Sequence, residues 1–163
     1  MNEETTDTAR VYRSTILVRF AACDPARIVF YPRYMEMFND LVEDWWREGL
    51  QLPFPELIGR GWGIPTVHLN VDFIAPSVLG ELLSASLSVS RIGRSSIFLD
   101  IVLQGPDGGH RVRGKVVLVL TDLRTHAASI IPDDLRARIS TFCQPAHLKE
   151  SYADPPTTPL AAS

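Results

Sequence analysis

A length of 163 residues and a hydrophobic fraction of 45% are typical of one domain with a single sizeable core. A formal net charge of −3 provides none of the strong positive field with which proteins attract nucleic-acid phosphates, so we expect no nucleic-acid partner. The chain has only two cysteines and no apolar run long enough to span a membrane, so we expect a cytoplasmic protein without a membrane partner.

Both ends of the chain are polar or rich in small residues. Residues 1–10 show no apolar periodicity, and residues 153–163 are rich in Pro, Thr and Ala, which cannot bury a core. We therefore expect a disordered segment at each end and a single folded domain over residues 11–152.

The first ordered elements are a strand and a long helix. Residues 14–20 are rich in β-branched and aromatic side chains, which predicts a strand. In residues 31–49 the apolar side chains recur with i, i+3, i+4 and i+7 spacing, which predicts a helix with one apolar face. Pro32 suits the first turn of this helix, and Gly49 supplies its end.

The rest of the ordered chain alternates apolar and polar residues, as half-buried strands do. The predicted strands are residues 66–75, 81–93, 95–105 and 110–125, and residues 131–143 predict a last short helix. This order of elements predicts an α+β fold in which a five-stranded antiparallel sheet wraps around one long central helix. Because such a sheet leaves edges and polar rows without a partner, we expect a homo-oligomer, either a dimer or a dimer of dimers.

One motif joins the end of the first strand to the start of the helix. Residues 23–38 read CDPARIVFYPRYMEMF, in which Asp24, Pro25 and Ala26 precede a short apolar run and a Tyr-Pro pair. With this motif the chain resembles the 4-hydroxybenzoyl-CoA thioesterase family of hotdog proteins, and the resemblance extends weakly over residues 14–143. The resemblance implies a hotdog fold, an acyl-CoA thioesterase activity and a homotetramer.

Asp24 and the backbone amide of Tyr31 are the predicted catalytic groups. Thioester hydrolysis needs a nucleophile or a general base, and it needs donors for the negative charge that develops on the carbonyl oxygen. Asp24 can serve in either of the first two roles. The first amides of the following helix have no partner within the helix, and the resemblance implies that the N–H of Tyr31 is the oxyanion donor. The alternative for Asp24 is a structural one, in which its carboxylate caps a turn or the helix.

The acyl group is predicted to contact Asn39, Phe30, His68 and Asn70. In the resembled aryl thioesterases an acidic residue, fifteen positions after the catalytic aspartate, meets the ring hydroxyl, and this chain has Asn39 there. An amide brings no negative charge to a phenol, so benzoyl, aminobenzoyl and aliphatic groups are alternatives to hydroxybenzoyl. His68 and Asn70 are expected to border the active site of a neighbouring subunit, although an interface histidine without a substrate contact is the alternative for His68.

The predicted contacts with CoA are Arg91, Arg94, Ser95 and Ser96. They lie in a turn between two strands, offer cations and hydroxyl groups for phosphates, and stand where the resemblance places the nucleotide. The alternative is that they are ordinary surface residues of a hairpin. Arg27 stands where the resembled family commonly has glycine, and its guanidinium could also reach a phosphate.

No separate cofactor is expected, because CoA is part of the substrate. The four histidines and two cysteines lack the spacing of metal ligands, so no metal site is predicted. Two other functions remain open at this point. One is a non-catalytic module that binds acyl-CoA or an acyl carrier protein, and the other is a hotdog dehydratase or hydratase, which would need a histidine with an acidic partner facing the substrate.

Overall fold

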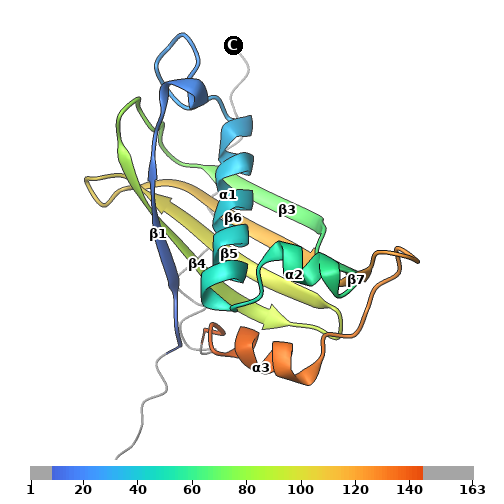
Figure 1. Cartoon of the computed structure of the whole chain (residues 1–163). Helices are drawn as coiled ribbons and strands as arrows, with labels where there is room; N and C mark the ends of the chain where they lie inside the picture. The colour runs from blue at the N-terminus through green and yellow to red at the C-terminus, as the bar shows by residue number, and fades with distance from the viewer. Residues whose placement is uncertain (1–8, 145–163) are drawn as a thin grey trace, which may run out of the picture.

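A five-stranded antiparallel sheet forms the main layer of the protein, for which a computed structural model describes residues 9–144 (Figure 1). Its strands are β1 (Tyr12–Leu17), β3 (Thr66–Phe73), β4 (Leu82–Ile92), β5 (Ser96–Gln104) and β6 (His110–Val119). They lie in the order β1-β4-β5-β6-β3, and each neighbouring pair is antiparallel. The α+β class and the five-stranded antiparallel sheet are confirmed. The predicted disordered ends fall almost wholly outside the described residues.

The helix α1 (Pro32–Asp44) lies across one face of this sheet (Figure 1). It continues into one π-helical segment, η2 (Trp45–Gly49), so the predicted helix over residues 31–49 is present but its last part is wound more widely. The apolar stripe of α1 is buried and consists of Tyr34, Met37, Phe38, Leu41 and Val42. Burial of this stripe against the sheet is what fixes the position of the helix.

The sheet presents one apolar face to α1. Side chains that alternate along β4 and β5 are almost completely buried there: Leu83, Ala85, Leu87, Val89, Ile97, Leu99, Ile101 and Leu103. Because successive side chains of a strand point to opposite faces, the serines between those β4 residues lie on the other face of the sheet. The alternation predicted for this strand is present from Leu82 to Val89, and the register of β4 against β5 shifts between Val89 and Arg91.

The edge strand β3 differs from the expectation for residues 66–75. Its apolar residues were predicted to face a core, but Val67 is 58% exposed, Leu69 41% and Phe73 53%. The reason is position, because β3 pairs only with β6 and lies at the end of the sheet. Within the described part of one chain, these three apolar side chains therefore lie on an edge strand that no further strand covers.

Several short elements are new relative to the sequence expectations. They are η1 (Phe20–Ala22), α2 (Phe54–Gly59) and a second, two-stranded sheet of β2 (Trp62–Gly63) and β7 (Thr121–Asp122). The last helix, α3 (Asp133–Ser140), falls inside the predicted helical range of residues 131–143. Among residues 9–144, no helix has the length and apolar character needed to cross a bilayer.

Two adjacent tryptophans at the end of α1 pack against α2 and against the segment after α3. The ring of Trp46 makes an edge contact with Phe54 of α2, with centroids 6.3 Å apart. The ring of Trp45 makes a similar contact with Phe142, which follows α3, at 5.7 Å. Both indoles are fully buried. The end of α1 is therefore the point at which α2 and the segment after α3 meet the main layer.

Candidate functional site

Asp24 lies in a tight loop between η1 and α1. Its backbone N–H donates to the carbonyl oxygen of Ile28 at 3.0 Å, and the N–H of Arg27 donates to the carbonyl oxygen of Asp24 at 2.9 Å. Oδ1 of Asp24 accepts a hydrogen bond from the N–H of Ala26 at 2.8 Å. The alternative in which Asp24 caps a turn therefore holds for this oxygen. Oδ2 accepts no hydrogen bond from the described residues and remains available for chemistry.

Arg27 has a backbone conformation that explains the glycine commonly found at its position. Its φ is 65°, in the left-handed region that side chains with a Cβ rarely adopt. The carbonyl oxygen of Arg27 accepts the N–H of Leu79 at 3.0 Å, which holds this conformation in place. The loop thus keeps its shape despite the arginine.

A buried serine anchors the loop to the helix. The hydroxyl of Tyr34, on α1, donates to Oγ of Ser77 at 2.9 Å, and the N–H of Ser77 donates back to the Tyr34 oxygen at 3.3 Å. The carbonyl oxygen of Ser77 in turn accepts the N–H of Val29 at 2.9 Å. Buried hydrogen bonds are costly to leave unmade, so this chain of contacts fixes the Asp24 loop relative to α1. The sequence analysis did not identify Ser77, which stands in a loop without any motif.

Tyr31 provides a free amide at the start of α1. The neighbouring N–H groups are engaged, since Phe30 donates to the carbonyl oxygen of Ala22 at 3.0 Å and Arg33 donates to that of Phe30 at 2.9 Å. Pro32 has no N–H, and the N–H of Tyr31 has no acceptor within the described part of the chain. An unpaired amide at the positive end of a helix can donate to a carbonyl oxygen that becomes negative.

A pocket of about 180 Å³ lies on the β3 side of α1, and Asn39 is one of its walls. The remaining lining residues come from α1, α2, the segment before β3, β3 itself and β6: Met35, Phe38, Val42, Phe54, Ile64, Pro65, Thr66, Leu69, Val116 and Leu118. Asn39 follows Tyr31 by about two turns, or about 12 Å along the helix axis at 1.5 Å per residue. Asn39 therefore lies on the helix that Tyr31 precedes, and neither Tyr31 nor Asp24 is among the residues that line the pocket.

Aromatic side chains surround the start of α1. The rings of Phe30 and Tyr31 are in contact, with centroids 5.4 Å apart, and Tyr31 also contacts Phe73 at 6.2 Å. Phe73 is the last residue of β3, so the loop and the edge strand meet at these rings. The predicted substrate residue Phe30 thus lies beside the predicted oxyanion donor.

His68 and Asn70 do not join this site within one chain. Leu69 is paired with Val116 and lines the pocket beside α1, whereas Asn70 is paired with Lys115. Because neighbouring residues of a strand point to opposite faces, His68 and Asn70 lie on the face that is turned away from α1. Their predicted contact with substrate would require a second copy of the chain.

The predicted CoA residues Arg91, Arg94, Ser95 and Ser96 also lie apart from Asp24. The Asp24 loop contacts the segment that leads into β4, whereas these residues follow or end that strand. The strand has 11 residues. At about 3.3 Å per residue it separates its two ends by about 33 Å. Arg136 of α3 donates to the carbonyl oxygens of Gly93 and Arg94, so the turn is held by α3.

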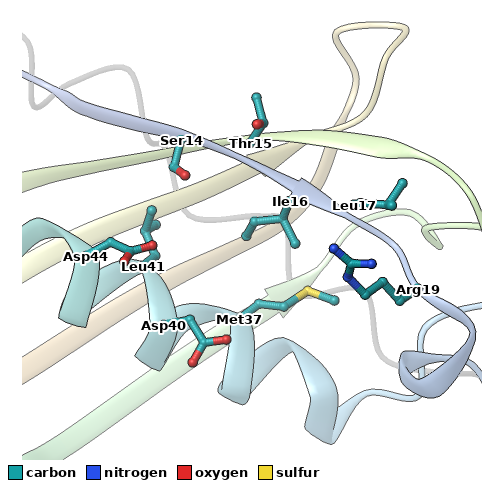
Figure 2. A pocket seen from close by; sticks show the side chains of 9 residues that line it. All are labelled: Ser14, Thr15, Ile16, Leu17, Arg19, Met37, Asp40, Leu41 and Asp44. Atoms are coloured by element: carbon teal, nitrogen blue, oxygen red, sulfur yellow. The ribbon is translucent and has the colours of Figure 1, made fainter.

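A second groove lies on the opposite side of α1, between that helix and β1 (Figure 2). It has a volume of about 240 Å³, and Met37 and Leu41 are among its walls. Asp40, Asp44 and Arg19 bring charged groups to it (Figure 2). Neither predicted catalytic residue lines this groove. The described part of the chain also has no group of three or more His, Cys, Asp or Glu side chains that could hold a metal ion.

Comparisons with known proteins show the family and the fold of the chain. A protein-family model described as "Thioesterase-like superfamily" matches residues 18–139. A 1,4-dihydroxy-2-naphthoyl-CoA hydrolase from Synechocystis is 28% identical over 75 residues, which cover 45% of this chain and 54% of the relative. The match thus spans about half the length of that curated relative.

Solved structures share the fold over nearly their whole length. A Staphylococcus aureus protein solved in complex with CoA has a TM-score of 0.78 at 17% identity, and the match covers 96% of this chain and 98% of that one. A gentisyl-coenzyme A thioesterase has a TM-score of 0.68 at 27% identity, with coverages of 78% and 99%. The neighbours and the five-stranded antiparallel sheet with a helix therefore support the hotdog fold that the resemblance implies.

Proposed function

Because this chain belongs to the thioesterase-like superfamily, we propose that it hydrolyses an acyl-CoA or aryl-CoA thioester to the free acid and CoA. The observation that carries the proposal is the unpaired N–H of Tyr31 at the start of α1, close along the chain to a carboxylate with one unengaged oxygen. The relatives that are named for naphthoyl-CoA and gentisyl-CoA favour an aromatic acyl group.

In the proposed reaction the N–H of Tyr31 donates to the thioester carbonyl oxygen and stabilises its negative charge. Oδ2 of Asp24 then either attacks the carbonyl carbon, which gives a mixed anhydride, or removes a proton from a water molecule that attacks in its place. In both routes the carbon–sulfur bond breaks and CoA leaves as the thiolate. In the first route water afterwards hydrolyses the anhydride and restores the carboxylate.

The test is the release of free thiol from a panel of CoA thioesters. Benzoyl, hydroxybenzoyl, aminobenzoyl and short aliphatic esters are offered to the wild type and to the Asp24→Asn variant. The amide oxygen of asparagine can still accept the N–H of Ala26, so the loop should keep its turn. We expect kcat to fall by about 10²- to 10⁴-fold, the range typical of a lost acid-base group. Comparable rates from both proteins would reject Asp24 as the essential carboxylate.

Asp40→Asn is the matched control. Asp40 is also a carboxylate, but it lies on α1 itself, lines the groove beside β1 and stands nine residues after Tyr31, whose N–H is the proposed oxyanion donor. Its replacement should leave the rate unchanged. A loss of rate as large as that of Asp24→Asn would indicate a general effect of charge near α1 and not a specific role of Asp24.

We also infer that a second copy covers the β3 edge. The exposed Val67, Leu69 and Phe73 follow this edge, and the unpaired backbone groups of an edge strand can pair with those of another. Sedimentation analysis of the wild type should therefore give at least a dimer. Val67→Lys should shift it towards the monomer, while Thr15→Lys on the opposite edge strand should not. A wild type that sediments as a monomer at all concentrations would contradict this inference.

A second copy is also required for part of the predicted site. The contacts of His68 and Asn70 with the acyl group, and of the turn at Arg91 and Arg94 with CoA, remain proposals that depend on a neighbouring chain. Replacing both arginines with alanine should then raise KM for acyl-CoA while leaving kcat nearly unchanged, because phosphate contacts are far from the reacting atoms. An unchanged KM would remove this turn from the CoA site.

Two simple assays distinguish thioester hydrolysis from the other two functions, which are acyl-CoA binding without catalysis and hydration. A silent binding module would bind acyl-CoA saturably without releasing thiol from any ester of the panel. A hydratase would add water to crotonyl-CoA, and it would need a histidine at the pocket. His68 lies on the opposite face of the sheet, and neither His110 nor His126 lines the pocket beside Asn39. The thioesterase proposal is the better supported one, because the family model that matches residues 18–139 is thioesterase-like.

A further inference from the structure

The pocket beside Asn39 has a distinct far end. Tyr31 precedes α1, whereas Trp46 lies beyond its last residue, about 22 Å further along at 1.5 Å per residue. Phe54 lines the pocket and its ring contacts Trp46, which places Phe54 near the carboxyl end of α1. Figure 1 shows α2 beside that end of the helix. An acyl group that enters from the Tyr31 end would therefore run along α1 towards Phe54.

The wall that Phe54 provides is rigidly held. α2 begins after Pro53 and carries Pro55 in its first turn, where a fixed φ favours the helix. Leu57 of α2 is buried in the core, and the fully buried Trp46 supports the ring of Phe54 from behind. A side chain packed in this way restricts the length of the bound acyl group more than a side chain on an unpacked loop would.

The size of the pocket agrees with a short acyl group. Its volume is about 180 Å³. An apolar cavity of about 150 Å³ in another protein is known to bind benzene. The pocket is thus of a size that holds one aromatic ring with a small substituent. Among residues 9–144, the polar side chains in its lining are those of Asn39 and Thr66, and both are neutral. They favour a substituent such as a hydroxyl or amino group over a charged one.

We propose that Phe54 is a specificity-determining residue that closes the far end of the acyl pocket and restricts the substrate to acyl groups with a single ring or of similar length. This inference rests on the proposed thioesterase function and names the substrate class of the same site. Phe54 acts by steric exclusion and takes no part in the reaction.

The test compares kcat/KM for benzoyl-CoA and 2-naphthoyl-CoA. The wild type should prefer the single ring, and Phe54→Ala should shift the ratio towards naphthoyl-CoA by at least tenfold, within the about 10- to 200-fold range over which pocket size discriminates. Phe54→Leu, which keeps the residue apolar, should give a smaller shift in the same direction. Thermal unfolding of each variant shows whether α2 is still folded.

Ile58→Ala is the matched control. Ile58 belongs to the same short helix, is 58% exposed and does not line the pocket. Its truncation should leave the ratio unchanged. A folded and active Phe54→Ala variant with the wild-type ratio would overturn the inference, as would an equal shift caused by Ile58→Ala.

A second measurement separates this inference from the proposed function. Benzyl-CoA and naphthylmethyl-CoA thioethers cannot be hydrolysed, and calorimetry gives their Kd for the wild type and for Phe54→Ala. If no ester is hydrolysed but the variant still gains affinity for the larger thioether, the thioesterase proposal fails and the inference about Phe54 stands. If the esters are hydrolysed but Phe54→Ala changes neither the kcat/KM ratio nor the ratio of the two Kd values, the inference about Phe54 fails and the thioesterase proposal stands. Absence of binding by both thioethers would overturn it as well.

Discussion

The ring of Phe38 on α1 lies directly over Gly114 of β6, so closely that a methyl group on the glycine would overlap the ring. This contact sets how near the helix comes to the sheet, and Phe38 is also a wall of the pocket beside Asn39. The depth of the pocket therefore depends on a residue that has no side chain.

Gly114→Ala should force Phe38 away from the sheet and lower the free energy of unfolding by about 1–3 kcal/mol, as overpacking of a core does. Urea denaturation monitored by circular dichroism measures this change. Gly59→Ala is the control, because no atom lies within 4 Å of the Cβ it would gain and alanine favours a helix. A Gly114→Ala protein as stable as the wild type would show that the ring can move without cost.

Tyr34→Phe should destabilise the protein by about 1–3 kcal/mol, because it leaves buried polar groups of Ser77 without a partner. It should also lower kcat, since Ser77 holds the loop of Asp24 through Val29. The double variant Tyr34→Phe/Ser77→Ala should lose less stability than the sum of the two single losses. Strict additivity of the two changes would contradict the coupling between these side chains.

Tyr31→Pro removes the amide that is proposed to bind the oxyanion. The φ of Tyr31 is −50°, which proline can adopt, so the helix should still begin at residue 32. We expect kcat to fall by about 10²- to 10³-fold, the effect typical of one lost oxyanion donor. Tyr31→Phe keeps the amide and should retain most of the rate. Equal loss in both variants would assign the effect to the ring and not to the backbone.

Tyr12→Phe should change the acid stability of the protein. The Tyr12 hydroxyl donates to Oε2 of Glu48 at 2.6 Å, and this bond is the main reason why the pKa of Glu48 lies below its usual 4.5. A carboxyl whose pKa is lower in the folded state contributes stability above the unfolded pKa and loses it as the pH falls through the folded pKa. The wild type should thus melt at a higher temperature than the variant at neutral pH, by a small amount because solvent screens the exposed Glu48.

That difference should shrink in acid, from about pH 4 downward. Thermal melts of the two proteins between neutral pH and acid provide the measurement. A difference that stays constant over this range would show that Glu48 gains nothing from the hydroxyl of Tyr12.

The main layer of the fold could be predicted because its signals are periodic. The apolar stripe of residues 31–49 gives the helix, and the serines between Leu83 and Val89 give the orientation of β4. α2 was missed because its six residues complete fewer than two turns and show no period within a Pro-rich connection. The same alternation that identified β3 could not show that its apolar face is open, because strand order is not local information.

Of the candidate site, the sequence could indicate only those residues that belong to one contiguous motif. Asp24 and Tyr31 are separated by one short loop, so their spacing in the sequence carries the geometry. Ser77 reaches Tyr34 across 43 positions, and nothing near Ser77 indicates that contact. The left-handed φ of Arg27 was likewise not predicted from the residue itself, because arginine, unlike glycine, does not favour such a conformation. His68 and Asn70 were predicted from the polar face of a strand. The sequence does not show which way that face points, because this depends on the order of the strands in the sheet.

The tryptophan pair at the end of α1 has a practical consequence for work on this protein. Trp46 touches Phe54, and Trp45 touches the ring that follows α3, so the two indoles sense both neighbouring elements. Fully buried indoles emit at shorter wavelengths than those in water, and their emission shifts when the surroundings open. Intrinsic fluorescence can thus report the loosening of α2 in solution without any added label.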